Sequence, residues 1–442
     1  MIYSEFKKYA KDLLNIAMPI IMGNLGFILI GAGDVLIAGR HSTDTLAAIS
    51  IATAISNCIL TFGVSLVAAV SPVISNFRGE KKAAKKYFYP TIRFAFFMAF
   101  LMMLVILGCV PLIDLFGFEA HLVPMIKEYM LITAFATFGG YLHCAMKEFL
   151  QAFEIVFIPN LVTVFAVFLN ILLNIILVFG WGIIPSLGVV GLAIASLITR
   201  YFMGIVLFIY AKMIMNFTDT NEVKDYYKQL VKVGLPISFA VLIEFVAFNS
   251  VAIFMGRVAG VYAAAQNLIC TLTTVSFMIP FAISNAIAVK VGFANGAKDI
   301  IDLRRYAFVG LGMAVGFMAF SSVIFALIPQ QLVRLFTIDV ELIKICVPVI
   351  YVLACFQVFD GLQISLSGIF KGIKKTKVVM FSNFVGYWLI AIPLGYTLAF
   401  KYNLNLVGFW IALIISAAIL CSIMFIILAK NLRIMKKTFA QN

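Results

Sequence analysis

The stretch Val233–Gly256 reads VGLPISFAVLIEFVAFNSVAIFMG and decides the fold class of this chain. Its roughly 24 residues are almost all apolar, and at about 1.5 Å per residue an α-helix of this length crosses a bilayer. Glu244 lies near the middle and is the only charged residue of the stretch. A charge at the bilayer centre costs about 3 kcal/mol on insertion scales, so a chain that keeps one normally uses it. We therefore interpret Glu244 as a functional residue; the alternative is a protonated side chain that hydrogen-bonds between helices.

The composition indicates that the chain as a whole is a membrane protein. Of its 442 residues, 64% are hydrophobic and 12% are charged, whereas soluble domains contain about 25% charged residues. Hydrophobic runs long enough to cross a membrane occur about twelve times, so the sequence predicts an all-α membrane protein with twelve transmembrane helices. We expect the spans at 13–37, 47–72, 92–114, 129–150, 161–182, 188–211, 233–256, 262–289, 306–328, 343–367, 378–400 and 406–429.

The net charge of +14 indicates orientation in a membrane and not nucleic-acid binding, because of where the charges lie. Most of the 33 Lys and Arg fall at the two termini and in alternate loops, with clusters at 78–86, 371–377 and 430–437. By the positive-inside rule, this asymmetry predicts that both termini are cytoplasmic. We expect a multi-pass protein of the plasma (inner) membrane that contacts anionic lipid and binds no nucleic acid.

The chain also contains an internal repeat. When the sequence is shifted by 217 residues, landmarks coincide without a gap, including Pro19 with Pro236 and Gly79 with Gly296. The sequence therefore predicts two lobes of six helices each, at residues 1–217 and 218–442. An even number of spans per lobe implies a pseudo-two-fold axis along the membrane normal, which is typical of alternating-access transporters. Pro19 and Pro236 lie early in equivalent helices, where we expect them to permit a helix bend.

A second carboxylate lies inside another predicted span. Asp360 is on the tenth span, with Gln357 and Gln363 three residues to either side, so one face of this helix is polar. Because an intramembrane carboxylate is costly, we expect Asp360 to be functional as well. The sequence does not decide whether Asp360 and Glu244 face the same cavity.

Polar residues of the N-terminal lobe are more ambiguous. Asp34 lies toward the outer end of the first span, and Asn170 and Asn174 share one face of the fifth span. The two amides either hydrogen-bond between helices or belong to an ion or proton site. Four other polar residues of the spans have no functional role that the sequence can assign. For His143 we favour a structural role, and Lys147 lies one helical turn from it. Arg200 and Lys290 lie near span ends, where we expect them to snorkel.

The chain resembles the MATE (multidrug and toxic compound extrusion) transporters, and the Glu and Asp of the seventh and tenth spans place it near the NorM-like branch. The similarity covers nearly the whole chain. The motifs that carry it are MPI at 18–20, GDVLIAGR at 33–40, LNILLN at 169–174, LPI at 235–237, AAAQN at 263–267, FMIP at 277–280, VKVGFANG at 289–296, FDGLQISLSGIFKGIKKTK at 359–377 and YWLIAIPLG at 387–395.

The resemblance implies roles for individual residues. Glu244 and Asp360 match the C-lobe carboxylates that bind Na⁺ or H⁺ in that branch, and Asp34, Asn170 and Asn174 fall where the family has an N-lobe polar site. The position of Asn174 is Asp in some members, so here the N-lobe site keeps one ionisable group. We expect a monomer that needs no cofactor besides the coupling ion.

These observations predict a secondary transporter that exchanges Na⁺ or H⁺ for amphipathic or cationic organic compounds by alternating access. Carboxylate oxygens suit Na⁺ as a hard ion, and a desolvated carboxyl group also suits proton exchange, so the coupling ion stays open. The alternative is a flippase for lipid-linked saccharides or other amphiphiles of the same superfamily; the acidic mid-membrane residues disfavour it. An intramembrane enzyme is a remote alternative, because the three His are far apart in the sequence and no HExxH or GxSxG motif occurs.

Overall fold

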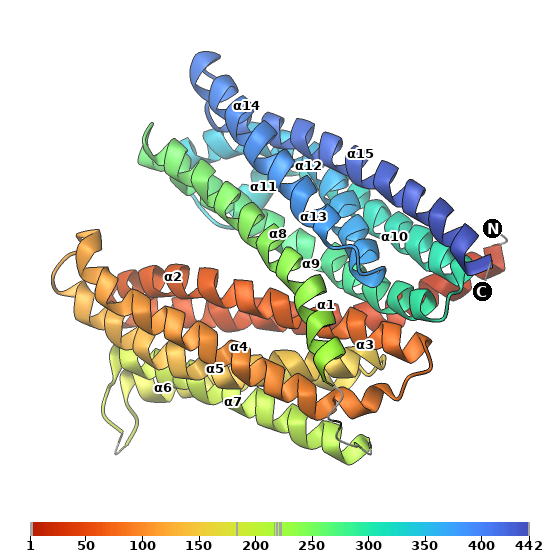
Figure 1. The fold of residues 1–442 in the computed structure, drawn as a ribbon. Coiled ribbons are helices and arrows are strands. Elements are labelled where there is room, and N and C mark those ends of the chain that lie inside the picture. The colour runs from red at the N-terminus through yellow and green to blue at the C-terminus, as the bar shows by residue number, and fades with distance from the viewer. Residues whose placement is uncertain (1–2, 183, 216, 218–219, 221–222, 441–442) are drawn as a thin grey trace. The chain divides into compact units, whose positions relative to one another are not determined.

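A computed structural model describes residues 3–182, 184–215, 217, 220 and 223–440, which form helices joined by short loops (Figure 1). Among these residues, 12 helical segments are long and apolar enough to cross a membrane, which confirms the predicted all-α fold class. Several segments extend beyond the predicted apolar runs, because polar turns at their ends continue the helix. The spans are Ser4–His41, Thr43–Gly79, Ala84–Phe116, Leu122–Ala152, Phe157–Phe179, Gly188–Ile214, Lys224–Gly256, Gly260–Gly296, Ile300–Leu327, Val340–Gly372, Lys377–Lys401 and Asn405–Phe439.

Contacts divide the chain into two compact units. Unit 1 comprises Met1–Met18, Ser75–Lys82 and Phe239–Asn442, and unit 2 comprises Pro19–Ile74 and Ala83–Ser238. Three helices contribute to both units: α1 (Tyr3–His41), α3 (Val70–Gly79) and α8 (Lys224–Gly256). In α1 the change of unit falls at Pro19, and in α8 it falls two residues after Pro236. The sequence-based lobes 1–217 and 218–442, and the bends at the two prolines, stay predictions.

Unit 2 is built around one central helix. The helices wholly within unit 2 are α2 (Thr43–Val67), α4 (Phe88–Cys109), α5 (Leu122–Ala152), which is the central one, α6 (Phe157–Phe179) and α7 (Gly188–Ile214). Two short 3₁₀-helices, η1 (Ala84–Tyr87) and η2 (Val110–Phe116), flank α4. Helix α5 packs against α2, α4 and α7, and α6 packs mainly on α7 (Figure 1). Gly139 lets α5 approach α7 closely, because a Cβ atom there would lie 2.6 Å from the backbone nitrogen of Tyr201.

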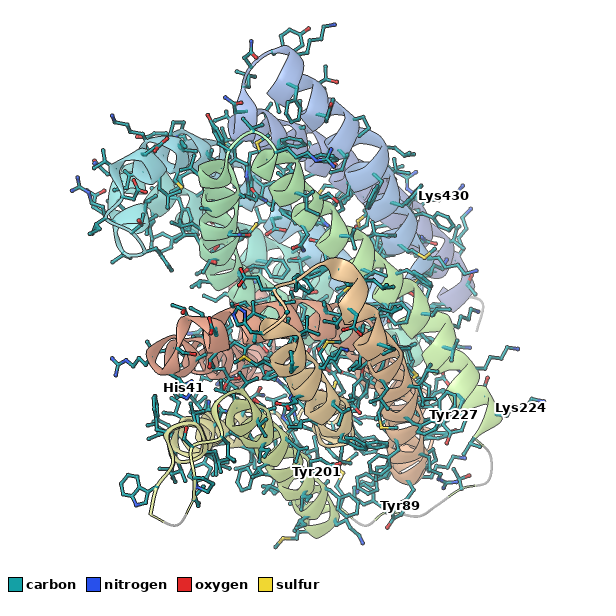
Figure 2. All side chains as sticks on the ribbon, turned by 90° about the vertical axis from the view of Figure 1, so that its left-hand side faces the viewer. His41, Tyr89, Tyr201, Lys224, Tyr227 and Lys430 are labelled. Carbon is teal, nitrogen blue, oxygen red and sulfur yellow. The ribbon has the colours of Figure 1, made fainter. Side chains whose placement is uncertain are left out.

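The first turns of α8 belong to unit 2 and pack against it through aromatic residues. The hydroxyl groups of Tyr226 and Thr91 are 2.6 Å apart, and both side chains are buried. Lys224 and Tyr227 mark this part of α8 in Figure 2. The predicted seventh span began at 233; the helix begins earlier because this amphipathic segment has its own packing partners.

In unit 1 the central helix is α12 (Val340–Gly372), which packs against α9 (Gly260–Gly296), α10 (Ile300–Leu327) and α15 (Asn405–Ala440). A short helix, α11 (Pro329–Arg334), follows α10. Asp299 and Asp339 begin α10 and α12, and each side chain accepts backbone N–H groups of the first turn at 2.9 to 3.4 Å.

The eleventh span has an unusual backbone. It consists of α13 (Lys377–Asn383), a π-helical segment η3 (Phe384–Ala391), α14 (Ile392–Tyr396) and a second π-helical segment η4 (Thr397–Lys401). π-Helical turns are rare and occur frequently at functional sites. The span packs on α15.

The end of α3 crosses the end of α9 inside unit 1 at the two glycines that the repeat aligns. A Cβ atom on Gly296 would lie 2.0 Å from the backbone oxygen of Asn76, and one on Gly79 would lie 2.1 Å from the backbone oxygen of Phe293. Any larger residue at either position would therefore force the two backbones apart. This close crossing explains why both copies of the repeat carry glycine here.

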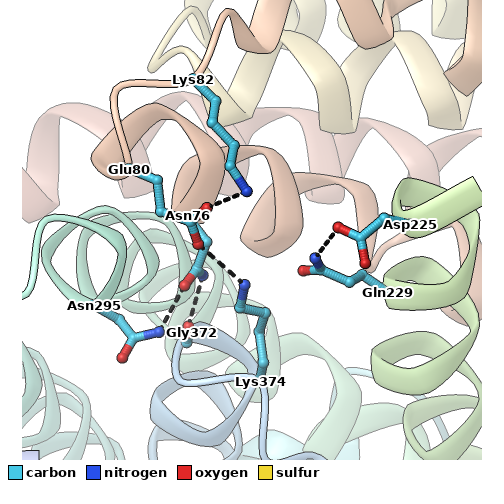
Figure 3. Close-up of polar contacts among 8 residues, drawn as sticks. All are labelled: Asn76, Glu80, Lys82, Asp225, Gln229, Asn295, Gly372 and Lys374. Carbon is cyan, nitrogen blue, oxygen red and sulfur yellow. Dashed lines mark hydrogen bonds and ion pairs between the residues drawn. The ribbon is translucent and has the colours of Figure 1, made fainter. Parts of the chain in front are cut away.

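Polar side chains hold this crossing in place (Figure 3). Asn76 Nδ2 donates to the backbone oxygen of Gly372 at 2.9 Å, and Asn295 Nδ2 donates to Asn76 Oδ1 at 2.6 Å. Glu80 pairs with Lys82 at 2.6 Å and with Lys374 at 3.8 Å. The ends of α3, α9 and α12 are thus joined by hydrogen bonds and charge.

Candidate functional site

Glu244 lies in unit 1 within a hydrogen-bonded network that links α8 to the eleventh span and to α12. Its Oε1 atom accepts a hydrogen bond from the Tyr387 hydroxyl at 3.1 Å, and its Oε2 atom accepts one from Asn383 Nδ2 at 3.3 Å. Gln363 Nε2 donates to the Tyr387 hydroxyl oxygen at 3.0 Å. Glu244 itself is half-buried, and these protein groups anchor its carboxylate.

Two residues of the eleventh span reach the same carboxylate because they lie four positions apart, on one helical face. Asn383 ends α13, and Tyr387 lies four residues later within η3. Trp388 follows and donates its indole N–H to the backbone oxygen of Ile243 at 3.1 Å, which ties η3 to α8 next to Glu244. The four-residue spacing and this contact with α8 therefore orient the hydroxyl and the amide toward Glu244.

Asp360 is buried in the same unit, on α12, and is close enough to Glu244 for electrostatic interaction between the two carboxyl groups. One turn earlier, Gln357 is fully buried, and neither its amide oxygen nor its amide nitrogen has a hydrogen-bond partner within the described residues. Buried amides are nearly always hydrogen-bonded, and an exception calls for an explanation such as a bound water or ion. The structure thus places the two predicted carboxylates in one unit and within electrostatic range of each other, with Asp360 one turn from an amide that has unused hydrogen-bonding capacity.

Aromatic rings lie next to this network. Phe248 is one helical turn after Glu244, and its ring centroid is 5.9 Å from that of Tyr387, 6.1 Å from that of Trp410 and 6.4 Å from that of Phe356. Trp410 donates its indole N–H to Gln266 Oε1 at 3.0 Å. Aromatic faces beside carboxylates suit organic cations, which gain from cation–π contacts as well as from charge.

In unit 2 the structure brings together the three predicted residues of the second polar site. Asn174 Nδ2 donates to Asp34 Oδ1 at 2.6 Å and is 3.1 Å from Asn170 Oδ1, and the Ser196 hydroxyl donates to Asp34 Oδ2 at 3.3 Å. Asn174 Oδ1 and Asn170 Nδ2 are buried and have no hydrogen-bond partner within the described residues. Asn174 therefore bonds between helices, from α6 to α1, and both amides keep unused capacity for a ligand.

Arg200 lies next to this second site, and the expectation that it sits near a span end is wrong. It occupies the middle of α7, one turn after Ser196, and its Cδ atom lies over Gly140 of α5. Its guanidinium group is close enough to Asp34 for direct electrostatic attraction. Tyr201, the next residue along α7 (Figure 2), donates its hydroxyl to the backbone oxygen of Phe135. Arg200 thus brings a positive charge beside the one carboxylate of the unit 2 site.

The remaining polar residues of the spans lie elsewhere. His143 is buried on α5, with its Nε2 atom 3.4 Å from the Thr163 hydroxyl, and Lys147 follows one turn later. Lys290 lies near the end of α9, with its ammonium group 5.6 Å from the centre of the Tyr306 ring. His143 and Lys147 thus belong to unit 2, and Lys290 belongs to unit 1.

Sequence reasoning missed Asn383 and Tyr387 as partners of Glu244, and Ser196 and Arg200 as partners of Asp34. A signal existed for Arg200, because counting residues along the sixth span puts it at mid-depth. Tyr387 was visible only as the first residue of the YWLIAIPLG motif. Within the described residues, no group of three or more His, Cys, Asp or Glu is placed to hold a metal ion; Na⁺ at Glu244 and Asp360 would depend on amide or hydroxyl oxygens as further ligands.

Comparison with known proteins decides the family. The MatE family profile matches residues 19–176 and 236–397, which together make up most of the chain and include Asp34, Asn170, Asn174, Glu244 and Asp360. The chain belongs to the MatE family. MatE proteins are transporters and not enzymes, so the prediction that this chain is not an enzyme is confirmed.

Relatives within the MatE family support this assignment along the full length. The chain is 27% identical over 420 residues to the probable multidrug resistance protein NorM of Bacillus subtilis (strain 168), covering 92% of each chain. It is 28% identical over 441 residues to the probable multidrug resistance protein NorM of Mesorhizobium japonicum, covering 95% of this chain and 93% of the relative.

Solved structures of MATE transporters share the fold. A mutant form of the Vibrio cholerae MATE transporter VcmN superposes with a TM-score of 0.91 at 18% identity, covering 97% of this chain and 98% of that one. The eukaryotic MATE transporter AtDTX14 superposes with a TM-score of 0.87 at 19% identity, covering 98% and 100%. The predicted resemblance to MATE transporters is therefore confirmed, and this MatE protein is a multi-pass membrane transporter.

Proposed function

We propose that this protein is a multidrug exporter that exchanges Na⁺ or H⁺ for amphipathic, often cationic, organic compounds by alternating access. The observation that carries the proposal is the Glu244 carboxylate, held by Asn383 and Tyr387 in the middle of a membrane span. Asp360 supplies a second carboxyl group nearby on α12. The relatives described as multidrug resistance proteins support the same class of substrate.

In this proposal, the coupling cation and the substrate compete for the same two carboxylates, Glu244 and Asp360. A coupling cation that enters from outside neutralises Glu244 and Asp360, which weakens the hold on a cationic substrate. A substrate that enters from the cytoplasm takes over the same charge and displaces the coupling cation. The ring of Phe248, which is partly exposed and one helical turn after Glu244, contacts the apolar part of the substrate, and the buried rings of Phe356 and Trp410 pack behind it.

The contrast between the two units supports coupling in unit 1. The unit 1 site holds two carboxyl groups, Glu244 and Asp360, with Lys371 as the basic group that acts on Glu244, whereas the unit 2 site holds the single carboxyl group of Asp34 with the guanidinium of Arg200 beside it. A cation gains less from a carboxylate whose charge is already compensated. We therefore assign the coupling ion to Glu244 and Asp360, and assign Asp34, Asn170 and Asn174 to a polar site that binds it less strongly.

The orientation of the protein in its membrane is assigned from the distribution of Lys and Arg. In unit 1, Glu5 near the start of the chain pairs with Arg305 at 2.8 Å, and Arg305 and Arg433 line a common cavity. The two ends of the chain therefore approach each other at one side of this unit, as expected for an even number of spans. We propose that this side is cytoplasmic, that the membrane is the inner membrane, and that the transporter acts as a monomer with no cofactor besides the coupling ion.

The test is transport by the purified protein in proteoliposomes with imposed gradients. A lipophilic fluorescent cation is loaded, and an inward Na⁺ gradient and an inward pH gradient are applied separately. We expect one of them to drive uphill movement of the dye. Dye movement that neither gradient accelerates would contradict the antiport proposal.

A further inference from the structure

A cavity of about 290 Å³ opens in unit 1 where α10 begins and α15 approaches its end. It is lined by three arginines and three apolar residues: Arg304, Arg305, Phe308, Ala429, Leu432 and Arg433. We propose that this cavity is a binding site for an anionic phospholipid, with the headgroup phosphate on the arginines and an acyl chain along the apolar residues.

The charges of the cavity favour an anion. Arg305 is already engaged, because it pairs with Glu5 at 2.8 Å and donates to the Tyr9 hydroxyl at 3.2 Å. Arg304 and Arg433 have no hydrogen bond or ion pair within the described residues. Two uncompensated guanidinium groups therefore face one cavity, and their planar forks match the oxygens of a phosphate.

The apolar residues favour a lipid over a free phosphate ion. Phe308 is one turn after Arg304 on α10, and Ala429 is one turn before Arg433 on α15, so both helices place apolar groups on the membrane side of the arginines. The Phe308 side chain is 43% exposed, which leaves its ring available to a hydrocarbon chain. A soluble phosphate would use the charged end alone.

A second cavity of unit 1, between the eleventh span and α15, has fewer basic groups. It measures about 270 Å³ and is lined mostly by apolar residues, with Lys377 as its single basic group. One ammonium group attracts anionic lipid weakly, at about 1 kcal/mol per basic residue near a membrane surface. We therefore assign headgroup selectivity to Arg304 and Arg433 and not to α15 in general.

The experiment measures lipid retained by the purified full-length chain, using native mass spectrometry after mixing with phosphatidylglycerol or phosphatidylcholine. We expect wild-type protein to retain phosphatidylglycerol in preference to phosphatidylcholine. The double variant Arg304→Gln/Arg433→Gln should weaken phosphatidylglycerol binding about thirtyfold, since two surface-proximal charges are removed. The matched control is Arg257→Gln/Arg334→Gln, which removes two exposed arginines of the same unit outside the cavity and should bind as wild type does.

Three results would overturn the proposal. The first is equal retention of the two lipids by wild-type protein, which needs no variant and so holds even if the double variant fails to fold. The second is unchanged phosphatidylglycerol binding by the double variant. The third is full displacement of phosphatidylglycerol by millimolar inorganic phosphate, which would identify a free phosphate site.

Discussion

The hydrogen bond from Tyr387 to Glu244 reports whether the carboxyl group is charged in the ion-free protein. Tyr387→Phe removes a hydroxyl whose oxygen is 3.1 Å from Glu244 Oε1. A hydrogen bond to a charged acceptor contributes about 1.5–3 kcal/mol to the free energy of unfolding, whereas a neutral pair contributes about 0.5–1.5 kcal/mol. The matched control is Tyr141→Phe, because the buried Tyr141 hydroxyl donates at the same distance of 3.1 Å to an uncharged acceptor, the backbone oxygen of Leu60.

The assay is denaturant unfolding of the purified protein in detergent micelles, with each variant also combined with Glu244→Gln. We expect Tyr387→Phe to cost about 1 kcal/mol more than Tyr141→Phe, and expect this excess to shrink in the Glu244→Gln background, where only neutral hydrogen bonds, including the one from Gln363, are lost. Saturation with the coupling ion should reduce the excess as well, because the carboxylate is then neutralised. A cost of Tyr387→Phe that is the same with and without Glu244→Gln would refute a charged Glu244 in the network.

Two further predictions concern the helix crossing and the unit 2 site. Gly296→Ala places a Cβ atom 2.0 Å from the backbone oxygen of Asn76 and should destabilise the protein by about 1–3 kcal/mol; Gly312→Ala, where nothing lies within 4 Å, is the control and should be neutral or slightly stabilising in the same unfolding assay. Arg200→Met leaves the oxygens of Asp34 without their neighbouring positive charge, so we expect about one additional bound ²²Na⁺ per chain relative to wild type. Unchanged ²²Na⁺ binding would show that Arg200 does not compensate Asp34.

Much of the fold was predictable because a bilayer restricts the backbone so strongly. Apolar runs alone predicted the twelve spans, since helices are the way a lipid-exposed chain satisfies its own backbone groups. The same restriction made Glu244 and Asp360 conspicuous, because a carboxylate in a span is rare and costly. The 217-residue offset also aligned Gly79 with Gly296, and the structure gives the reason, as both glycines lie at one close helix crossing.

The partners of the carboxylates were not predictable, because they depend on which helices pack together. Tyr387 and Asn383 are ordinary residue types in a span, and their approach to Glu244 depends on the packing of the eleventh span against α8. Arg200 was misjudged because its charge suggested snorkelling, whereas packing of α7 on α5 directs it inward, toward Asp34. The sequence shows that a residue is polar and how deep it lies, but not which neighbours it meets.

The central claim is that Glu244 couples an ion gradient to export, and uphill transport by Glu244→Gln tests it most directly. Wild-type protein and the variant are compared in proteoliposomes under the gradient that drives wild-type export, with Glu341→Gln, an exposed carboxylate in the first turn of α12, as the control. We predict that Glu244→Gln loses uphill export while Glu341→Gln retains it. Export by Glu244→Gln against the substrate gradient at the wild-type rate would contradict the account.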